Sequence, residues 1–404
     1  MASQSIESDD SPPRHSLTRR MLQWATKDIA CGQLTIETPQ GSAIEFIGKQ
    51  PGQQAHLKIN SWRFLLRLLL SWDVGFAEAY LAGEWSSPDL PALLHFMSIN
   101  TNMGKSFQEL RLPGAIRRLR HALNRNTRRG SQRNIATHYN LGNAFYAQWL
   151  DPRMIYSSGL YSENHQTLPE AQQAKLERVA ELLDFSGGEH VLEIGCGWGG
   201  LAEMLAVRHD CFVTGLTLSS EQLTYAQDRI DQSSARDRCE FLLQDYRDTK
   251  GTFDRIVSIE MLEAVGEAYW TVYFETLRAR LKKDGVAVLQ VITIGENHFE
   301  SYRRNPDFIQ RYVFPGGMLP TVEIIAERAC SAGLQVVSQE FFSDSYARTL
   351  ANWHLRFKQS WSLIKPMGFD ARFKRMWDYY LAYSQAGFET GVVNVGLYKI
   401  SHEA

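Results

Sequence analysis

A short apolar run followed at once by a glycine-rich loop constrains this chain more than any other feature. Residues 190–194 are predicted to form a buried strand, and Gly195, Gly197 and Gly199 follow at every second position. Glycine lets the backbone turn sharply and approach a ligand, because it has no Cβ. Residues 201–208 continue as a predicted helix, whose N-terminal amides would face a ligand in the loop. Strand, glycine turn and helix in this order favour an α/β fold with a nucleotide-type site.

The spacing of the glycines narrows the kind of site. It differs from the dinucleotide pattern, and it is not a phosphate-binding loop because no Gly-Lys-Ser/Thr follows. The run Glu-x-Gly-x-Gly-x-Gly, which begins at Glu193, resembles the first motif of S-adenosylmethionine-dependent methyltransferases. We therefore assign Glu193, Gly195, Gly197 and Gly199 to cofactor binding. The alternative is a tight turn without a ligand.

The chain from residue 135 onward alternates between helical and strand patterns. Pro169 opens a predicted helix with one apolar face. Strands are predicted at about 189–194, 211–216, 238–243, 253–259, 284–293, 334–341 and 391–400. Helices separate the earlier strands, which predicts a doubly wound, seven-stranded methyltransferase-type sheet with its ligand at the carboxyl ends of the strands.

A smaller unit precedes this region. Residues 33–59 alternate between apolar and polar side chains, which predicts strands, and residues 61–72, 76–82 and 88–98 have helical patterns. We predict four segments from these patterns. They are a flexible tail at 1–14, a small α+β domain at 15–110, a basic arginine-rich linker at 111–134 and the α/β domain at 135–404.

Composition argues against several other classes of protein. A formal net charge of −2 gives no support for nucleic-acid binding, and the five cysteines lack the spacing of a zinc site. Scattered cysteines favour reduced thiols in a cytoplasm. The most apolar segment, residues 62–72, contains Arg63 and Arg67 and is too short to cross a membrane. We expect a soluble, cytoplasmic protein without a bound metal.

The linker has an unusual charge pattern. No acidic residue occurs between Leu112 and Leu150, whereas arginines cluster between positions 111 and 133 beside apolar residues at helical spacing. Such a stretch suits the surface of an anionic membrane, and a solvated linker is an equal alternative. In the first case the protein would associate peripherally with the inner face of the membrane. The contacts would be Arg117, Arg118, Arg128 and Arg129.

Polar residues after the next two predicted strands complete the cofactor site. Thr217 and Gln222 follow the second strand and are suited to bind a ribose or an amino-acid tail. Asp245 follows the third strand and is suited to bind the amino group of an adenine. The neighbouring Tyr246 would stack on the adenine ring. Ser219 is as well explained as the cap of the following helix.

Several motifs in one order resemble a single family. They are His138-Tyr-Asn-Leu-Gly-Asn-Ala-Phe-Tyr146, Tyr156-Ser157, Gly195-Cys-Gly-Trp-Gly199, Gly215-Leu-Thr-Leu-Ser219 and Phe314-Pro-Gly-Gly317. Over about residues 20–400 the chain resembles cyclopropane-fatty-acyl-phospholipid synthases and mycolic acid cyclopropane synthases. The resemblance implies that residues 135–404 bind S-adenosylmethionine and an acyl chain. The substrate would be a cis double bond of a membrane phospholipid, with bicarbonate as the base.

The resemblance also assigns individual residues. Those matched to the cofactor are Tyr156, Ser157, Gly195, Gly197, Thr217, Leu218, Gln222, Tyr246 and Arg247. Glu263 and Tyr346 match the glutamate and tyrosine of the family's bicarbonate site. A glutamate buried beside an anion should share a proton with it, so a raised pKa of Glu263 is expected.

This chain departs from the family at three positions. Ser158 and Ser384 stand where the family has cysteines, and we keep both as candidate catalytic residues because serine preserves a hydrogen bond. Ile292 stands where the family has the histidine of its bicarbonate site. Loss of that histidine removes a contact to the ion.

Three functions are consistent with these residues. The leading one is the synthesis of cyclopropane fatty acyl chains, and a close alternative is a methyltransferase that gives methyl-branched or methylene acyl chains. An alternative of another class is a protein that binds cofactor and lipid without turnover. No nucleic-acid partner is expected, and a homodimer is compatible with each function.

Overall fold

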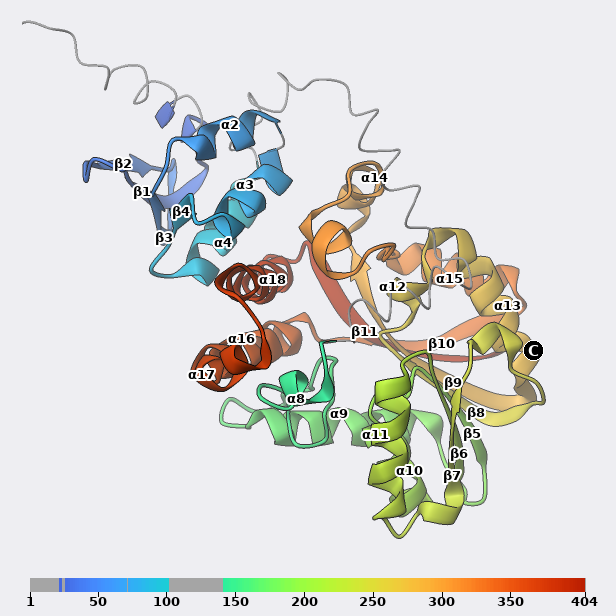
Figure 1. The fold of residues 1–404 in the computed structure, drawn as a ribbon. Helices are drawn as coiled ribbons and strands as arrows, with labels where there is room; N and C mark the ends of the chain where they lie inside the picture. The colour runs from blue at the N-terminus through green and yellow to red at the C-terminus, as the bar shows by residue number, and fades with distance from the viewer. Residues whose placement is uncertain (1–21, 24–25, 71, 102–140, 404) are drawn as a thin grey trace, which may run out of the picture. The chain divides into compact units, whose positions relative to one another are not determined.

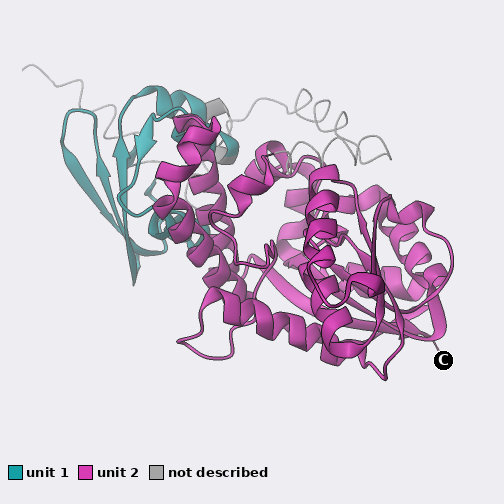
Figure 2. Ribbon diagram, turned by 60° about the horizontal axis from the view of Figure 1, so that its bottom comes forward, with its two compact units in different colours: residues 1–113 teal, residues 114–404 magenta. Residues whose placement is uncertain are grey.

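A computed structural model describes residues 22–23, 26–70, 72–101 and 141–403. The chain divides into two compact units, residues 1–113 and 114–404, which Figure 2 draws in different colours. The predicted tail at 1–14 and the arginine-rich linker at 111–134 lie outside the described residues.

Unit 1 is an α+β unit, as predicted. Its four-stranded sheet has the order β2-β1-β3-β4, with β1 antiparallel to β2 and parallel to β3. Its strands are β1 (Cys31–Glu37), β2 (Ala43–Ile47), β3 (Gln50–Ile59) and β4 (Trp85–Ser86). Its described helices include α2 (Arg63–Leu70), α3 (Trp72–Leu81) and α4 (Leu90–Ile99). Alternate residues of β1, such as Leu34 and Ile36, are buried, so one face of the sheet contributes to the core.

Asn100 joins helix α4 to the first strand. Its buried side-chain oxygen accepts hydrogen bonds from the backbone N–H groups of Ala30 and Cys31 at 2.8 and 3.2 Å. Its amide donates to the carbonyls of Cys31 and Phe96 at 3.0 and 2.9 Å. One side chain therefore satisfies four backbone groups where the strand begins and the helix ends.

Unit 2 contains the predicted seven-stranded sheet (Figure 1), in the order β10-β11-β9-β8-β5-β6-β7. The strands are β5 (His190–Ile194), β6 (Phe212–Thr217), β7 (Cys239–Leu243), β8 (Phe253–Ile259), β9 (Leu281–Ile294), β10 (Leu334–Phe341) and β11 (Val393–His402). Strands β5 to β9 pair in parallel, whereas β11 runs antiparallel to both of its neighbours. Each predicted strand is present, with ends that agree or differ by at most three residues.

Helices cover both faces of this sheet. The α-helices of unit 2 are α8 (Asn143–Tyr146), α9 (Leu168–Leu183), α10 (Gly200–His209), α11 (Ser220–Asp231), α12 (Leu262–Val265), α13 (Trp270–Arg280), α14 (Glu296–Arg304), α15 (Val322–Ser331), α16 (Ser343–Gln359), α17 (Trp361–Ile364) and α18 (Ala371–Glu389). Short 3-10 or π turns lie at Arg236–Arg238, Tyr246–Asp248, Glu267–Tyr269, Ile309–Val313 and Lys365–Met367. One core packs α9 and α10 against the sheet through residues such as Leu176 and Leu205. The other packs α13 and α15 against it through Trp270 and Ile325.

The strand order places an open crevice at the end of β5. The chain passes from β5 outward through β6 and β7, then returns to the other side of β5 as β8. Connections leave β5 and β8 in opposite directions, so their carboxyl ends are not covered by a shared helix. Open α/β sheets bind their ligands at such a point.

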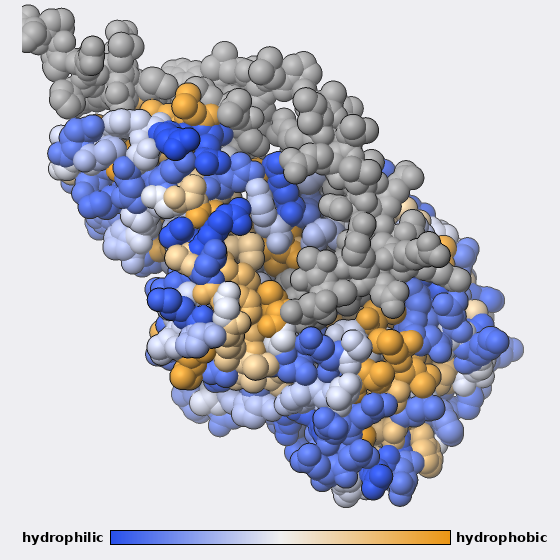
Figure 3. Space-filling view, viewed as in Figure 1, coloured by the Kyte–Doolittle hydropathy of each residue, from blue (hydrophilic) through white to orange (hydrophobic). Residues whose placement is uncertain are grey.

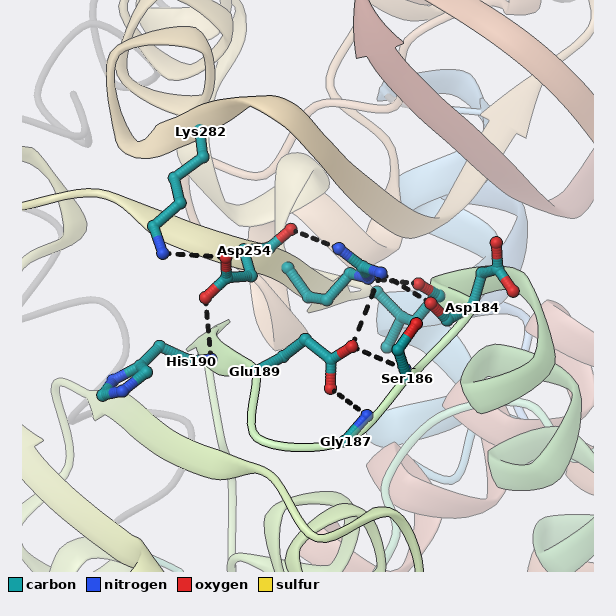
Figure 4. A network of polar contacts seen from close by, with 9 residues as sticks. Asp184, Ser186, Gly187, Glu189, His190, Asp254 and Lys282 are labelled. Carbon is teal, nitrogen blue, oxygen red and sulfur yellow. Dashed lines mark hydrogen bonds and ion pairs between the residues drawn. The ribbon is translucent and has the colours of Figure 1, made fainter.

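At the opposite end of the central strands lies the polar network drawn in Figure 4. Asp254 accepts hydrogen bonds from the backbone N–H of His190 at 3.0 Å and from Lys282 Nζ at 2.7 Å. Glu189 accepts from the backbone N–H groups of Ser186 and Gly187. These residues lie at the amino ends of β5, β8 and β9, so the network fixes the strands away from the ligand crevice.

Candidate active site

A cleft of about 920 Å³, part of it open to solvent, lies at the carboxyl ends of β5, β6 and β8. Gly195 and Gly197 form its floor with φ angles of +85° and +52°, which L side chains rarely adopt. A Cβ on Gly195 would lie 2.4 Å from Met261 Cγ, whereas nothing lies within 4 Å of a Cβ on Gly197. The loop therefore leaves open space beside its backbone, as a close-fitting ligand requires.

Most of the residues assigned to the cofactor from the sequence line this cleft. They are Tyr156, Ser157, Glu193, Gly195, Gly197, Thr217, Leu218, Gln222 and Tyr246. Thr217 Oγ1 donates to Gln222 Oε1 at 2.9 Å, so these two candidates are held as a pair. Ser219 caps α11 by accepting from the backbone N–H of Gln222 at 3.3 Å, the structural role considered for it.

Three of the assigned residues do not line the cleft. Gly199 is the N-cap of α10, where its φ of +79° turns the loop into the helix. Asp245 forms an ion pair with Arg247 at 2.6 Å and also accepts from that residue's backbone N–H at 3.0 Å. Because its oxygens are already occupied, Asp245 is poorly placed to bind adenine. The neighbours that do line the cleft are Gln244 and Tyr246.

A buried carboxyl group in the cleft, that of Glu193, favours a cationic ligand. Glu193 is buried, one of its carboxylate oxygens has no hydrogen-bond partner, and burial raises its pKa to about 8. Lys175, which the sequence analysis did not select, extends from α9 and donates to Ser157 Oγ at 3.0 Å. Burial lowers the pKa of Lys175 to about 8. An unpartnered buried carboxylate is costly, and a bound cation would compensate for it.

Glu260 is a second residue that the sequence analysis did not select. It follows β8 directly, lines the cleft and has a φ of +51°, in the left-handed region. Its Oε1 accepts hydrogen bonds from the backbone N–H of Ser158 at 2.9 Å and from Gln290 Nε2 at 2.8 Å. Its Oε2 accepts from Tyr346 Oη at 2.6 Å. The carboxylate is therefore held from both sides by donors on distant segments.

Glu263 lies one helical turn further, on α12. Its carboxylate accepts from the backbone N–H of Ile292, and its Oε2 is buried without a partner. Burial, with a smaller contribution from the charge of Glu260, raises its pKa to about 8, the direction expected from the sequence. Glu260 thus lies nearer to the strand end than Glu263, lines the cleft and accepts the hydrogen bond from Tyr346. The catalytic assignment of Glu263 and Tyr346 stays a prediction.

The two serines at family cysteine positions differ in their surroundings. Ser158 is fully buried, and its hydroxyl donates to the carbonyl of Gly159 at 2.8 Å. Ser384 is half-buried on α18, one helical turn after Tyr380. Tyr380 Oη lies 2.8 Å from Tyr156 Oη, so this face of α18 continues toward the cleft wall. The catalytic assignment of both serines stays a prediction.

Tyr156 lines the cleft, and further aromatic rings are buried in contact with it or with Tyr346. Tyr156 packs against Trp353 with ring centroids 5.4 Å apart, and Tyr346 packs against Phe388 at 4.4 Å. Aromatic faces attract cations. Phe357 and Trp377, at helical spacing in the same region, are fully buried and belong to the core.

Comparison with known proteins identifies the family. Residues 126–397 match the protein family described as mycolic acid cyclopropane synthetase. This chain belongs to that family. The tuberculostearic acid methyltransferase UfaA1 of Mycobacterium tuberculosis is 36% identical over 332 residues, which cover 80% of this chain and 77% of that protein. Cyclopropane-fatty-acyl-phospholipid synthase of Escherichia coli K12 is 35% identical over 334 residues, covering 81% and 82%.

Solved structures of the family share the fold of unit 2. The mycolic acid cyclopropane synthase CmaA1, complexed with SAH and CTAB, superposes with a TM-score of 0.63 at 28% identity. The match covers 67% of this chain and 97% of that one. The chain is thus an S-adenosylmethionine-dependent methyltransferase, as the resemblance implied.

S-Adenosylmethionine fits the observed cleft. It supplies an electrophilic methyl group on a positively charged sulfur. The open space at Gly197 allows close approach of the ligand to the loop, and the unpartnered oxygen of Glu193 favours a cation. Tyr156, Thr217 and Gln222 would hold its remaining polar groups.

Proposed function

We propose that this enzyme methylates the cis double bond of unsaturated acyl chains in membrane phospholipids and closes a cyclopropane ring. The observation that carries the proposal is Glu260, which lines the cofactor cleft and is held by a hydrogen bond from the buried Tyr346. Methyl transfer to an oxygen or nitrogen needs no base for a carbon-bound proton. Methyl transfer to an alkene does, because a carbocation remains and must lose a proton.

The surroundings of the pair suit this reaction. An alkene is a weak nucleophile, so the protein must hold the reacting carbon close to the methyl donor and in line with it. The ring of Tyr156 lines the cleft and offers a face that stabilises a developing cation, and the buried ring of Trp353 packs against it. Relatives named for fatty acyl substrates support the same class of substrate.

A second product is favoured by one feature of this chain. Ile292, an apolar residue, stands where the resemblance expects the histidine of the bicarbonate site, and its N–H contacts Glu263. A different arrangement of the base would allow loss of a proton from a chain carbon, which gives a methyl-branched alkene. A hydride shift to the neighbouring cationic carbon, followed by loss of a methyl proton, gives a methylene chain. The second candidate function is therefore fatty-acyl C-methylation without ring closure.

We propose that the enzyme reaches its substrate as a peripheral protein on the cytoplasmic face of the membrane. Within the described residues no helix is long and apolar enough to span a bilayer. Leu355, Leu363 and Met367 are exposed near Lys358 and Lys365 in sequence, and Figure 3 shows apolar residues gathered among polar ones over α16 and α17. Exposed apolar side chains together with lysines suit an anionic lipid surface. Arg117, Arg118, Arg128 and Arg129 would add to this attraction.

Lipid analysis of cells that express the chain tests the proposed function. Mass spectrometry should show monounsaturated phospholipids that have gained one CH₂ group, and proton NMR should show upfield ring protons. The same gain with vinyl or branched-methyl signals would replace the first candidate by the second. No gain in cells that contain unsaturated phospholipids would favour a protein that binds cofactor and lipid without turnover.

A further inference from the structure

The resemblance implies a bicarbonate ion as the base, and the residues of this chain do not fit one. The N–H of Ser158, the hydroxyl of Tyr346 and the amide of Gln290 are donors that could hold an anion, and all three bind the carboxylate of Glu260 instead. Ile292 offers no side-chain donor.

The polar atom left over beside the Glu260 carboxylate does not suit an anion. Gln290 donates its amide to Glu260, and its buried Oε1, which has no partner, is an acceptor only. An anion is stabilised by donors and cations, and a site that offers acceptors beside a fixed carboxylate disfavours it. A carboxylate belonging to the protein therefore stands among the donors that would otherwise hold the ion.

We infer that Glu260 is the base that removes the proton in this enzyme, and that turnover requires no bicarbonate. The inference rests on the proposed function, since it assigns the proton acceptor of that reaction. As the methyl–sulfur bond breaks, its electrons stay on sulfur, and the alkene electrons form the new carbon–carbon bond. The Glu260 carboxylate then takes one proton from the resulting cation. The electrons of that C–H bond close the ring or form a new double bond, and the proton later leaves to solvent.

The position of Glu260 is consistent with this role. It is half-buried and lines the cleft, whereas Ser158, Gln290 and Tyr346, which hold it, are buried behind it. Its Oε2 retains a lone pair beyond the bond to Tyr346. Burial raises the pKa of Glu260, and its three donors and the charge of Lys175 act in the opposite direction. Tyr346 is thus a positioning residue that orients the carboxylate.

The backbone of Glu260 provides independent support. A φ of +51° lies in the left-handed region, which is strained for a residue with a Cβ and which glycine adopts without that strain. The next two residues return to ordinary helical geometry at the start of α12. Strain of this kind is retained where a side chain must be held at a functional site.

Two substitutions of Glu260 test the inference in the full-length enzyme. Glu260→Gly removes the carboxylate without backbone strain, and Glu260→Gln keeps the shape without the charge. Both should lower turnover by about 1,000-fold or more while S-adenosylmethionine binding, measured by calorimetry, stays within about threefold. Added bicarbonate or formate should partly restore turnover in Glu260→Gly, where space is open, and not in Glu260→Gln. A loss confined to Glu263→Gln instead would assign the base to Glu263 and overturn the inference.

Bicarbonate binding provides a readout that is independent of activity. Titration of ¹³C-labelled bicarbonate, followed by NMR line width, should show no saturable binding to the parent enzyme and saturable binding to Glu260→Gly. Saturable binding to the parent, or a parent rate that falls when bicarbonate is removed, would contradict the inference. Absence of any methylated lipid product from the parent, with or without bicarbonate, would instead contradict the proposed function.

Discussion

Replacing Gly197 by valine separates the ligand role of the glycine loop from its role in folding. Gly197 has a φ of +52°, and nothing lies within 4 Å of a Cβ built on it. A valine there should fit without a clash and cost about 1–2 kcal/mol through its left-handed backbone. For a domain of this size that corresponds to a fall in melting temperature of about 2–4 °C per kcal/mol. The side chain would project into the cofactor cleft, so S-adenosylmethionine affinity should fall at least about 100-fold, or about 3 kcal/mol.

Gly391 supplies the matched control for this substitution. It also has a positive φ, +70°, and a Cβ at this position would meet nothing within 4 Å, yet it sits in the turn before β11. Gly391→Val should lose similar stability and bind S-adenosylmethionine as tightly as the parent. Calorimetric titration and thermal unfolding of both variants provide the comparison. Unchanged affinity in a folded Gly197→Val variant would refute the assignment of this loop to the cofactor.

Three further predictions follow from charge and hydrogen bonding. Because burial raises the pKa of Glu193 to about 8, the group holds a proton at neutral pH, and a cationic ligand should displace it. S-Adenosylmethionine affinity should therefore rise between about pH 6 and pH 8, with proton release visible by calorimetry in two buffers, and Glu193→Gln should flatten this dependence. Replacing Arg117, Arg118, Arg128 and Arg129 by Gln should weaken binding to anionic vesicles by about 1 kcal/mol per residue, an effect that salt should mimic; equal sedimentation of variant and parent would refute it. Asn100→Ala leaves two backbone N–H groups unpaired, at about 1–3 kcal/mol each, so hydrogen exchange should accelerate in β1 and not in β5.

The elements of the fold could be predicted because each depends on local pattern. An apolar run indicated the strand at 190–194. Apolar residues at helical spacing, together with Pro169 in the first turn, indicated the helix that begins there. The ends were less predictable. Strand β9 begins at Leu281 instead of about 284, because Leu281 pairs with Phe253 of β8 ahead of an irregularity in register. Lys282 and Lys283, which follow Leu281, have no strand-like pattern.

The candidate site was predictable only where its residues are close in sequence. The glycine loop and the Thr217–Gln222 segment line the cleft because neighbouring residues at a strand end share one location. Glu260 was missed because its partners come from residues far away in the chain, such as Ser158 and Tyr346. Two features of the sequence could have indicated Glu260. It is a polar residue directly after β8, and its partner Gln290 lies inside an apolar strand. The pairing of Asp245 with Arg247 depends on side-chain conformation, so the sequence could not indicate it.

The most direct measurement of the central claim follows the transferred methyl group. The purified full chain would be incubated with S-adenosylmethionine carrying a trideuterated methyl group and with vesicles of cis-monounsaturated phosphatidylglycerol. We predict that the label enters the acyl chain, that one deuteron is lost in ring closure, and that upfield ring signals appear. Label that enters the acyl chain with all its deuterons would favour the methyl-branched product. Label found only on a headgroup, or absent from the lipid, would contradict methylation of the acyl double bond.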